Sequence, residues 1–398
     1  MSALKYWIWL SSLSGIGPVI AARLLSRFGT PEKVFRAGAG EYMYIEGIKA
    51  ADIEKLKAKN ADAANRILAS CAGSGYRIIT FQDAEYPDRL RNIYDPPLVL
   101  YVRGNLPAID EEAVVAVVGT RDCTPYGIGS AESIGYKLSQ NGLIVATGLA
   151  KGIDAAATRG ALRAGGRVIG VIGSGLDTVY PAENKQLFED VAYSGAIISE
   201  YPPGTPAVRA HFPARNRIIS GISLGVAVIE APKKSGALIT ASRALEQGRD
   251  VFTLPGNVDT RSCEGSNALL REGAIPILTG DDIIAEYADL FPDRTMPEER
   301  AKTAPHIGET RTPDKAPLKK VIDNAPSVDY IDLDKIADGL QGNEKTVAET
   351  IGTEIRHIDE IIVRSGLPAG QVQTALTMLE IKGIASRGTN GKWKIEVK

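Results

Sequence analysis

The chain has 398 residues, of which 44% are hydrophobic and 24% are charged, and its formal net charge is −2. This length exceeds a typical single domain, so we expect two or three folding units. No run approaches the roughly 18 apolar residues of a membrane span, and the small negative charge excludes an overall attraction to nucleic acid, so a nucleic-acid site would need a local basic surface.

The N-terminal residues and the cysteines indicate the cellular compartment of the protein. The first 15 residues are too short in their apolar part and too weakly basic for a secretory signal. The three cysteines, Cys71, Cys123 and Cys263, are widely spaced and match neither a disulfide framework nor a zinc site. We therefore expect a cytoplasmic protein without a membrane anchor and without a metal.

Residues 1–75 predict a helical domain of the SAM-like or helix-hairpin-helix type. Residues 13–29 and 45–57 both read as helix, glycine hairpin, helix. Backbone N–H groups of such a hairpin and the following helix N-terminus can meet a phosphate. A packing hairpin would use the same glycines, and the second stretch lacks a second glycine. DNA contact and plain packing therefore both stay open for this region.

Residues 76–290 predict an extended Rossmann-like domain of the α/β class. Residues 76–111 read as a strand, a proline-punctuated loop and another strand, which would extend the central sheet. From about residue 112, short β-branched runs such as AVVAVVG and RVIGVIG alternate with helical stretches. This alternation predicts a doubly wound, mostly parallel sheet whose ligands lie beyond the carboxyl ends of its strands.

The last part of the chain predicts a linker and a second small domain. Residues 291–327 are rich in Pro, Lys, Glu and Thr without sustained periodicity, as is typical of a linker. Residues 328–398 carry helix-spaced apolar residues, followed by two strand-like runs around Asn390 and Gly391. Helices followed by a hairpin predict a winged helix, with a small helical cap as the alternative.

The usual patterns of cofactor sites and catalytic sites are missing. The segment 117–127 has one glycine where a dinucleotide site needs two, and residues 172–181 have Thr178 in place of the third glycine. No phosphate-binding P-loop, nucleophile elbow or His pair at metal-ligand spacing occurs. Asp154, Glu200 and Glu230 follow strands, where acids often orient loops instead of catalysing. We expect no cofactor and no catalytic residue.

The loops at the strand ends instead offer backbone N–H groups and cations. A helix N-terminus beside Ser and Lys is a ready anion site, and several such sites in a row would follow a strand of phosphates. From Pro202 to Ile229 there are arginines and no Asp or Glu, which weakens the alternative that each arginine pairs with a carboxylate. The candidate phosphate-binding residues are Gly119, Thr120, Arg121, Gly148, Lys151, Arg215, Asn216, Arg217, Lys233, Lys234, Ser235 and Gly236.

Several motifs of the sheet domain, taken in order, resemble the DNA-processing protein A family, also called DprA or Smf. They include VVGTRDCTPYG, FPARNRIISG and VIEAPKKSGALITA. The resemblance implies a three-part, non-enzymatic protein that binds single-stranded DNA during natural transformation, protects it and helps load the recombinase RecA. It also implies a homodimer through the sheet domain, and a phosphate groove formed by Arg121, the run Arg215 to Arg217, and Lys234 beside Ser235.

A second hypothesis is an enzyme of the same sheet class, a nucleotide phosphoribohydrolase resembling the lysine-decarboxylase-like proteins. The G-G-x-G-T run of those proteins is absent, and Leu254 to Thr260 has a single glycine after its proline. A sequence-specific repressor is a third hypothesis, but the expected recognition helix at Leu367 to Met378 has no Arg or Lys to hold DNA. DNA binding by the sheet domain is therefore the leading interpretation.

Overall fold

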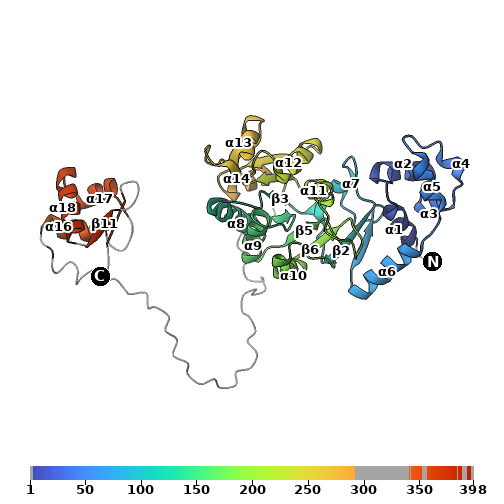
Figure 1. Ribbon diagram of the computed structural model, residues 1–398, viewed down its shortest axis with the longest axis horizontal. Helices are drawn as coiled ribbons and strands as arrows, with labels where there is room; N and C mark the ends of the chain where they lie inside the picture. The colour runs from blue at the N-terminus through green and yellow to red at the C-terminus, as the bar shows by residue number, and fades with distance from the viewer. Residues whose placement is uncertain are drawn as a thin grey trace, which may run out of the picture. The chain divides into compact units, whose positions relative to one another are not determined.

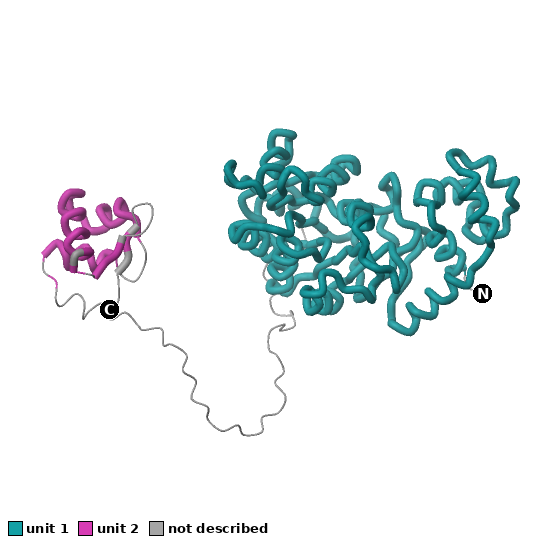
Figure 2. Tube along the Cα trace, viewed as in Figure 1, with its two compact units in different colours: residues 1–310 teal, residues 311–398 magenta. Residues whose placement is uncertain are grey.

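The computed structural model describes residues 3–291, 340, 342–351, 356–382, 384–387 and 392–395. The chain divides into two compact units, residues 1–310 and residues 311–398 (Figure 2). The linker predicted for residues 291–327 lies outside the described residues, except for Phe291.

Unit one begins with six helices that enclose a small aromatic core. Trp7 and Trp9 on α1 are buried, and Trp9 meets Phe35 edge-on, with ring centroids 4.9 Å apart. Gly29 ends α2 with a φ of 81°, a conformation that L side chains rarely adopt. The helices are α1 (Leu4–Ser12), α2 (Pro18–Phe28), α3 (Pro31–Arg36), α4 (Ala39–Tyr42), α5 (Ala50–Lys57) and α6 (Asp62–Ser74).

A nine-stranded sheet forms the centre of unit one (Figure 1), with the strand order β1-β2-β6-β5-β4-β3-β7-β8-β9. The strands are β1 (Arg77–Thr80), β2 (Val99–Gly104), β3 (Val114–Val118), β4 (Ile144–Thr147), β5 (Val168–Ile172), β6 (Ala196–Ser199), β7 (Gly225–Val228), β8 (Asp250–Thr253) and β9 (Ile275–Pro276). Strands β3 to β9 pair in parallel, and β2 adds to β6 in antiparallel orientation. The predicted doubly wound sheet is confirmed.

Helices cover both faces of this sheet, because its strands are apolar on both sides. Val115 and Val117 of β3 face one core, and Val114 and Ala116 face the other. Helices α8 (Pro125–Gln140), α9 (Ile153–Arg163), α10 (Lys185–Ser194) and α14 (Gly280–Tyr287) pack on the first face. Helices α7 (Asp88–Arg91), α11 (His211–Gly221), α12 (Gly236–Glu246) and α13 (Glu264–Arg271) pack on the second.

The core of the first face continues into the N-terminal helices. Trp7 and Leu24 belong to the same apolar cluster as Leu98 and Tyr101 at strand β2. The helical region is therefore fixed to the sheet by a shared core and not only by a chain connection.

Unit two is a small helical domain with a three-stranded sheet in the order β10-β12-β11. Its elements are α16 (Asn343–Ile351), β10 (Arg356–His357), α17 (Ile358–Ser365), α18 (Ala369–Ile381), β11 (Ala385–Arg387) and β12 (Lys392–Ile395). Val347, Ile361, Leu376 and Trp393 form its core. This arrangement agrees with the predicted winged helix, although the predicted turn at Asn390 and Gly391 lies outside the described residues.

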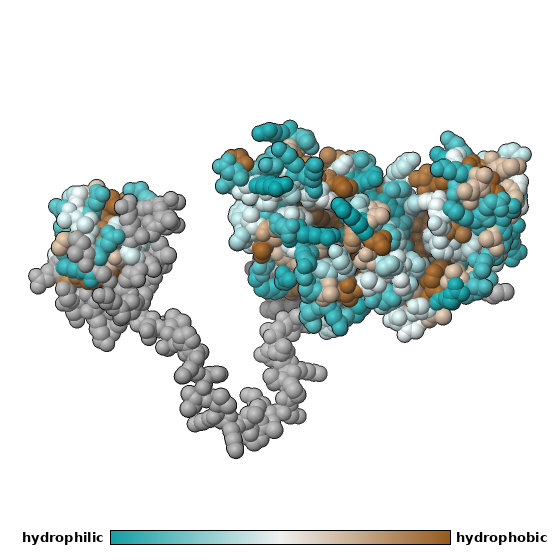
Figure 3. Space-filling view, viewed as in Figure 1, coloured by the Kyte–Doolittle hydropathy of each residue, from teal (hydrophilic) through white to brown (hydrophobic). Residues whose placement is uncertain are grey.

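The surface of the described residues is mostly polar. In Figure 3 the visible face of unit one is largely teal and white, and its hydrophobic residues lie in small separate areas. Large exposed apolar side chains occur singly or in pairs, such as Met43 and Tyr44. No helix among these residues has the length and the apolar content needed to cross a bilayer.

Candidate nucleic-acid interface

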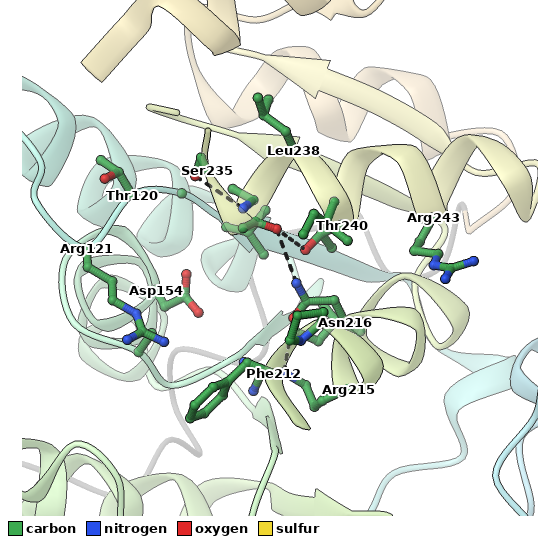
Figure 4. A pocket seen from close by; sticks show the side chains of 18 of the residues that line it. Thr120, Arg121, Asp154, Phe212, Arg215, Asn216, Ser235, Leu238, Thr240 and Arg243 are labelled. Carbon is green, nitrogen blue, oxygen red and sulfur yellow. Dashed lines mark hydrogen bonds between the residues drawn. The ribbon is translucent and has the colours of Figure 1, made fainter. Parts of the chain in front are cut away.

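A pocket of about 1300 Å³ lies at the carboxyl ends of the parallel strands. The loop after β3, the loop after β4, helix α11 and the N-terminus of α12 contribute its walls. In Figure 4 the side chains of Arg121, Asp154 and Asn216 come from different elements and face the same open space. This is the edge of a doubly wound sheet where ligands are expected.

The loop after β3 presents Arg121 to this pocket. A Cβ on Gly119 would stand 2.5 Å from the Ile153 side chain and 2.9 Å from the Glu230 carbonyl oxygen, so only glycine fits there. The Thr120 N–H donates to the Glu230 carbonyl over 2.7 Å and fixes the next residue. The exposed guanidinium of Arg121 lies 5.9 Å from the ring centroid of Tyr180 and 5.3 Å from that of Phe212. Among the described residues, no acidic side chain forms an ion pair with Arg121.

Glu230, at the end of β7, shapes this loop from beneath. Its carboxylate is fully buried and accepts hydrogen bonds from the Thr124 N–H, over 2.9 Å, and from the Thr124 hydroxyl. The residue thus does what acids at strand ends often do, which is to orient a loop by accepting backbone hydrogen bonds.

Helix α12 directs its N-terminus into the pocket. The Ser235 hydroxyl caps the helix by accepting the Ala237 N–H over 3.2 Å. Lys234 is exposed and has no ion pair within the described part of the chain, whereas Lys233 lies 3.6 Å from the Glu264 carboxylate. The N-terminus of α12 therefore combines the positive end of the helix dipole with an unpaired lysine, Lys234, and a loosely paired one, Lys233.

Gly236 and Gly119 provide a matched pair of substitutions. A Cβ on Gly236 would meet no atom within 4 Å, whereas a Cβ on Gly119 would collide with Ile153 and the Glu230 backbone. We expect Gly236→Ala to leave the melting temperature within about 2 °C, and Gly119→Ala to lower it clearly. If a ligand backbone approaches the start of α12, Gly236→Ala should still weaken anion binding. Thermal unfolding and binding assays on both variants check this, and equal melting temperatures for the two would contradict it.

Arg215 forms the floor of the pocket instead of projecting into it. It is 5% exposed and donates to the carbonyl oxygens of Gly148, over 3.0 Å, and of Val171. Burial lowers the pKa of its guanidinium to about 10, although the Asp154 carboxylate opposes the shift. The predicted cation is therefore at the site, but its hydrogen bonds go to the protein.

Gly148 and Asn216 are also engaged within the protein. The Gly148 N–H donates to the Asp154 carboxylate over 2.9 Å, and the Asn216 amide donates to the Gly236 carbonyl over 3.2 Å. A Cβ on Gly148 would lie 2.6 Å from the Arg215 guanidinium. The expectation that the Gly148 N–H is free for a phosphate is wrong, because a buried carboxylate occupies it.

The inference that Arg217 lacks an acidic partner is also wrong. Its guanidinium, 5% exposed, lies 2.7 Å from the Glu200 carboxylate and 3.2 Å from the Asp95 carboxylate. Burial alone would lower the pKa of Arg217, but these two carboxylates raise it overall. Both acids lie outside the acid-free stretch and are brought to Arg217 by the fold. Arg217 therefore serves a buried ion pair and not the pocket surface.

The sequence did not indicate two further arginines of the pocket, and a second predicted lysine, Lys151, is paired like Lys233. Arg209 is exposed, lines the pocket and has no acidic partner among the described residues. It belongs to the same acid-free stretch as Arg215, and that stretch was the signal that could have found it. Arg243 lines the far end and lies 2.7 Å from the Glu246 carboxylate. Lys151 lies 2.7 Å from the Glu183 carboxylate at the rim.

The charge of the pocket differs from that of the chain. Its lining includes six Lys and Arg residues against three Asp and Glu, in a chain with a net charge of −2. Arg121, Arg209 and Lys234 are the exposed members that form no ion pair in the described structure, and Arg215, which forms none either, is buried. The arrangement attracts anions locally and can hold phosphate groups.

Comparison with known families identifies the parts of the chain. The family described as DNA recombination-mediator protein A matches residues 77–288, which include the nine-stranded sheet and the pocket. The DprA winged helix domain matches residues 333–391. The predicted alternative of a helical cap is thus excluded for the last domain.

Individual relatives extend the same likeness. Protein Smf of Synechocystis is 34% identical over 96% of both chains, and the DNA processing protein DprA of Streptococcus pneumoniae is 46% identical over 51% of this chain and 71% of its own. The X-ray structure of the Streptococcus pneumoniae DprA covers 72% of this chain and 99% of its own at 36% identity, with a TM-score of 0.64. The chain belongs to the DNA recombination-mediator protein A family.

Proposed function

We propose that this protein binds single-stranded DNA in the pocket of unit one and acts as a recombination mediator in DNA processing. The main observation in its favour is that three unpaired cations, Arg121, Arg209 and Lys234, line the same pocket as the N-terminus of α12. Relatives that are named DNA processing protein support it.

The proposal gives the candidate residues different roles. Arg121, Arg209 and Lys234 contact phosphates, and Lys233, Ser235 and Gly236 form the start of α12 beside them. Gly119, Thr120, Gly148, Arg215 and Asn216 shape the loops and floor behind them, as their hydrogen bonds and close contacts suggest. Lys151 lies at the rim, and Arg217 stabilises the fold.

The preference for single strands rests on aromatic rings next to the cations. Tyr180 is 43% exposed, and its ring centroid lies 5.4 Å from that of Phe212, beside the Arg121 guanidinium. Bases of a single strand can stack on such rings, whereas bases inside a duplex cannot reach them. Backbone contacts by Arg and Lys add affinity that is independent of sequence.

The partners and the compartment follow from this role. The proposal places the protein in the cytoplasm, as a homodimer through the sheet domain that helps RecA bind to single strands during natural transformation. It assigns no catalytic reaction and no cofactor. The alternative of a nucleotide phosphoribohydrolase is not favoured by the family matches, and release of free base from nucleoside monophosphates by the pure protein would revive it.

A competition assay tests the proposed function. Labelled single-stranded DNA bound to the full chain is challenged with unlabelled single or double strands at two salt concentrations. We expect single strands to compete better, and log K to fall with log salt at a slope of about −2, since three phosphate contacts contribute about −0.7 each. Equal competition by duplex, or binding that ignores salt, would contradict the proposal.

Truncation separates the pocket from the last domain. Removing residues 292–398 leaves every described element of unit one in place, so we expect single-strand affinity to change less than about threefold. Removing residues 1–75 should instead lower stability, because Leu98 and Tyr101 would lose the helices packed on them. Binding and unfolding curves of both truncated chains check this. A large loss of affinity in the first, still folded, would place essential DNA contacts outside unit one.

A further inference from the structure

Asp154 lies where four parts of the pocket meet. It is the second residue of α9, is 6% exposed and lines the pocket. Its carboxylate accepts the Gly148 N–H over 2.9 Å, and the backbone groups of Ala150 and Gly119 lower its pKa. The carboxylate thus holds the loop after β4 at the start of α9, where the neighbouring Ile153 N–H donates to the Thr120 carbonyl of the loop after β3 over 3.3 Å.

Arg215 of α11 completes this junction. A Cβ on Gly148 would lie 2.8 Å from the Asp154 carboxylate and 2.6 Å from the Arg215 guanidinium, so both groups pack closely against Gly148. At pH 7 a guanidinium whose pKa is about 10 stays protonated. The Arg215 guanidinium is therefore positively charged, and Asp154 is the carboxylate that raises its pKa, although the two groups form no direct ion pair.

A buried carboxylate is unexpected in the lining of a pocket that binds anions. It repels an incoming phosphate, and burial raises the pKa of Asp154, whereas Arg215 and the hydrogen bond from the Gly148 N–H favour its charged form. The other two acids of the pocket lining, Asp122 and Glu246, are exposed, so water screens their charges. Asp154 alone combines burial with contacts to both strand-end loops.

We propose that Asp154 is the positioning residue of the DNA pocket: it holds the two strand-end loops in the arrangement that presents Arg121, and it cancels the charge of Arg215. This inference rests on the proposed function, since it takes the bound anion to be a phosphate of single-stranded DNA. Arg215 then contributes shape to the floor of the pocket but no net charge to binding.

The variant Asp154→Asn in the full chain separates these two effects. Asparagine keeps the size of the side chain and removes its charge, so Arg215 becomes an uncompensated cation beneath the phosphate. We expect the slope of log K against log salt to steepen by up to about 0.7. Extrapolated to 1 M salt, where charge effects are screened, affinity should fall about tenfold, because the loops are held less firmly. A merely structural role would lower affinity without changing the slope.

Two further variants keep the test decisive. The double variant Asp154→Asn/Arg215→Met removes both charges, so its slope should return to that of the wild type even if its affinity is low. Glu112→Gln is the control, because Glu112 is a buried acid 2.7 Å from Arg167 at the opposite ends of the strands. We expect it to lower stability and to leave the slope unchanged.

Each result has a distinct meaning. A wild-type slope in Asp154→Asn overturns the inference, and so does a steeper slope with undiminished affinity at 1 M salt. If the single variant does not fold, the double variant decides: a slope that differs from the wild type overturns the proposed cancellation of charge. Failure of the wild type to bind single strands overturns the proposed function itself, and the two failures are therefore distinguishable.

Discussion

Replacing Arg217 by alanine is expected to lower the free energy of unfolding by about 3 to 5 kcal/mol, because it leaves two carboxylates without their buried partner. The guanidinium donates to Glu200 over 2.7 Å, to the Asp95 carbonyl over 2.9 Å and to the Ala214 carbonyl over 2.9 Å. Denaturant unfolding of the full chain measures the loss.

The control for this variant is Arg163→Ala. The Arg163 side chain is 60% exposed in its ion pair with Glu132, so its removal should cost less than about 1 kcal/mol. At low temperature, where Arg217→Ala remains folded, its salt slope for single-stranded DNA should equal that of the wild type. A flatter slope in folded Arg217→Ala would show that this guanidinium meets phosphate after all.

Removing Arg121 and Arg209 together is expected to cause the largest loss of DNA affinity. A hydrogen bond to a charged group contributes about 1.5 to 3 kcal/mol, so each substitution by alanine should weaken binding at least tenfold at low salt. The slope of log K against log salt should flatten by about 0.7 for each residue. Because phosphates carry no sequence information, the loss should be similar on different base sequences.

Fluorescence anisotropy with oligonucleotides of several sequences measures these losses. Arg163→Ala again serves as the matched control, because it removes an exposed arginine from the far end of α9. Arg121→Lys keeps the cation but loses the planar fork of donors, and should recover part of the affinity. Unchanged affinity in the folded double variant would mean that DNA does not enter this pocket.

The sheet and the position of the site were predictable because they depend on local patterns. Short β-branched runs such as 114–118 and 168–172 are typical of strands buried on both faces, and their alternation with helices predicts a parallel sheet. The carboxyl ends of such strands meet at one edge. The loops at Gly119, Gly148 and Gly236 could therefore be assigned to one place without knowledge of any contact.

The roles of individual side chains were less predictable, because they depend on residues distant in sequence. No acid lies between Pro202 and Ile229, yet Arg217 meets Asp95, which is 122 residues away. Likewise, the sequence alone could not show that the Gly148 N–H would be taken by Asp154 and the Asn216 amide by Gly236. A pattern of residue types indicates which groups are available, but only packing decides which of them remain free.

The place of β2 in the sheet affects how the protein is made. Its partner β6 lies almost a hundred residues further on, with Tyr101 opposite Ser199. A ribosome that adds about 5 to 20 residues per second exposes the unpaired β2 edge for about 5 to 20 s before β6 emerges. During that time Val99 and Tyr101 can be covered only by the N-terminal helices, which have already been synthesised. We therefore expect the N-terminal helices to cover the apolar side chains of β2 during synthesis, although its edge stays unpaired until β6 emerges.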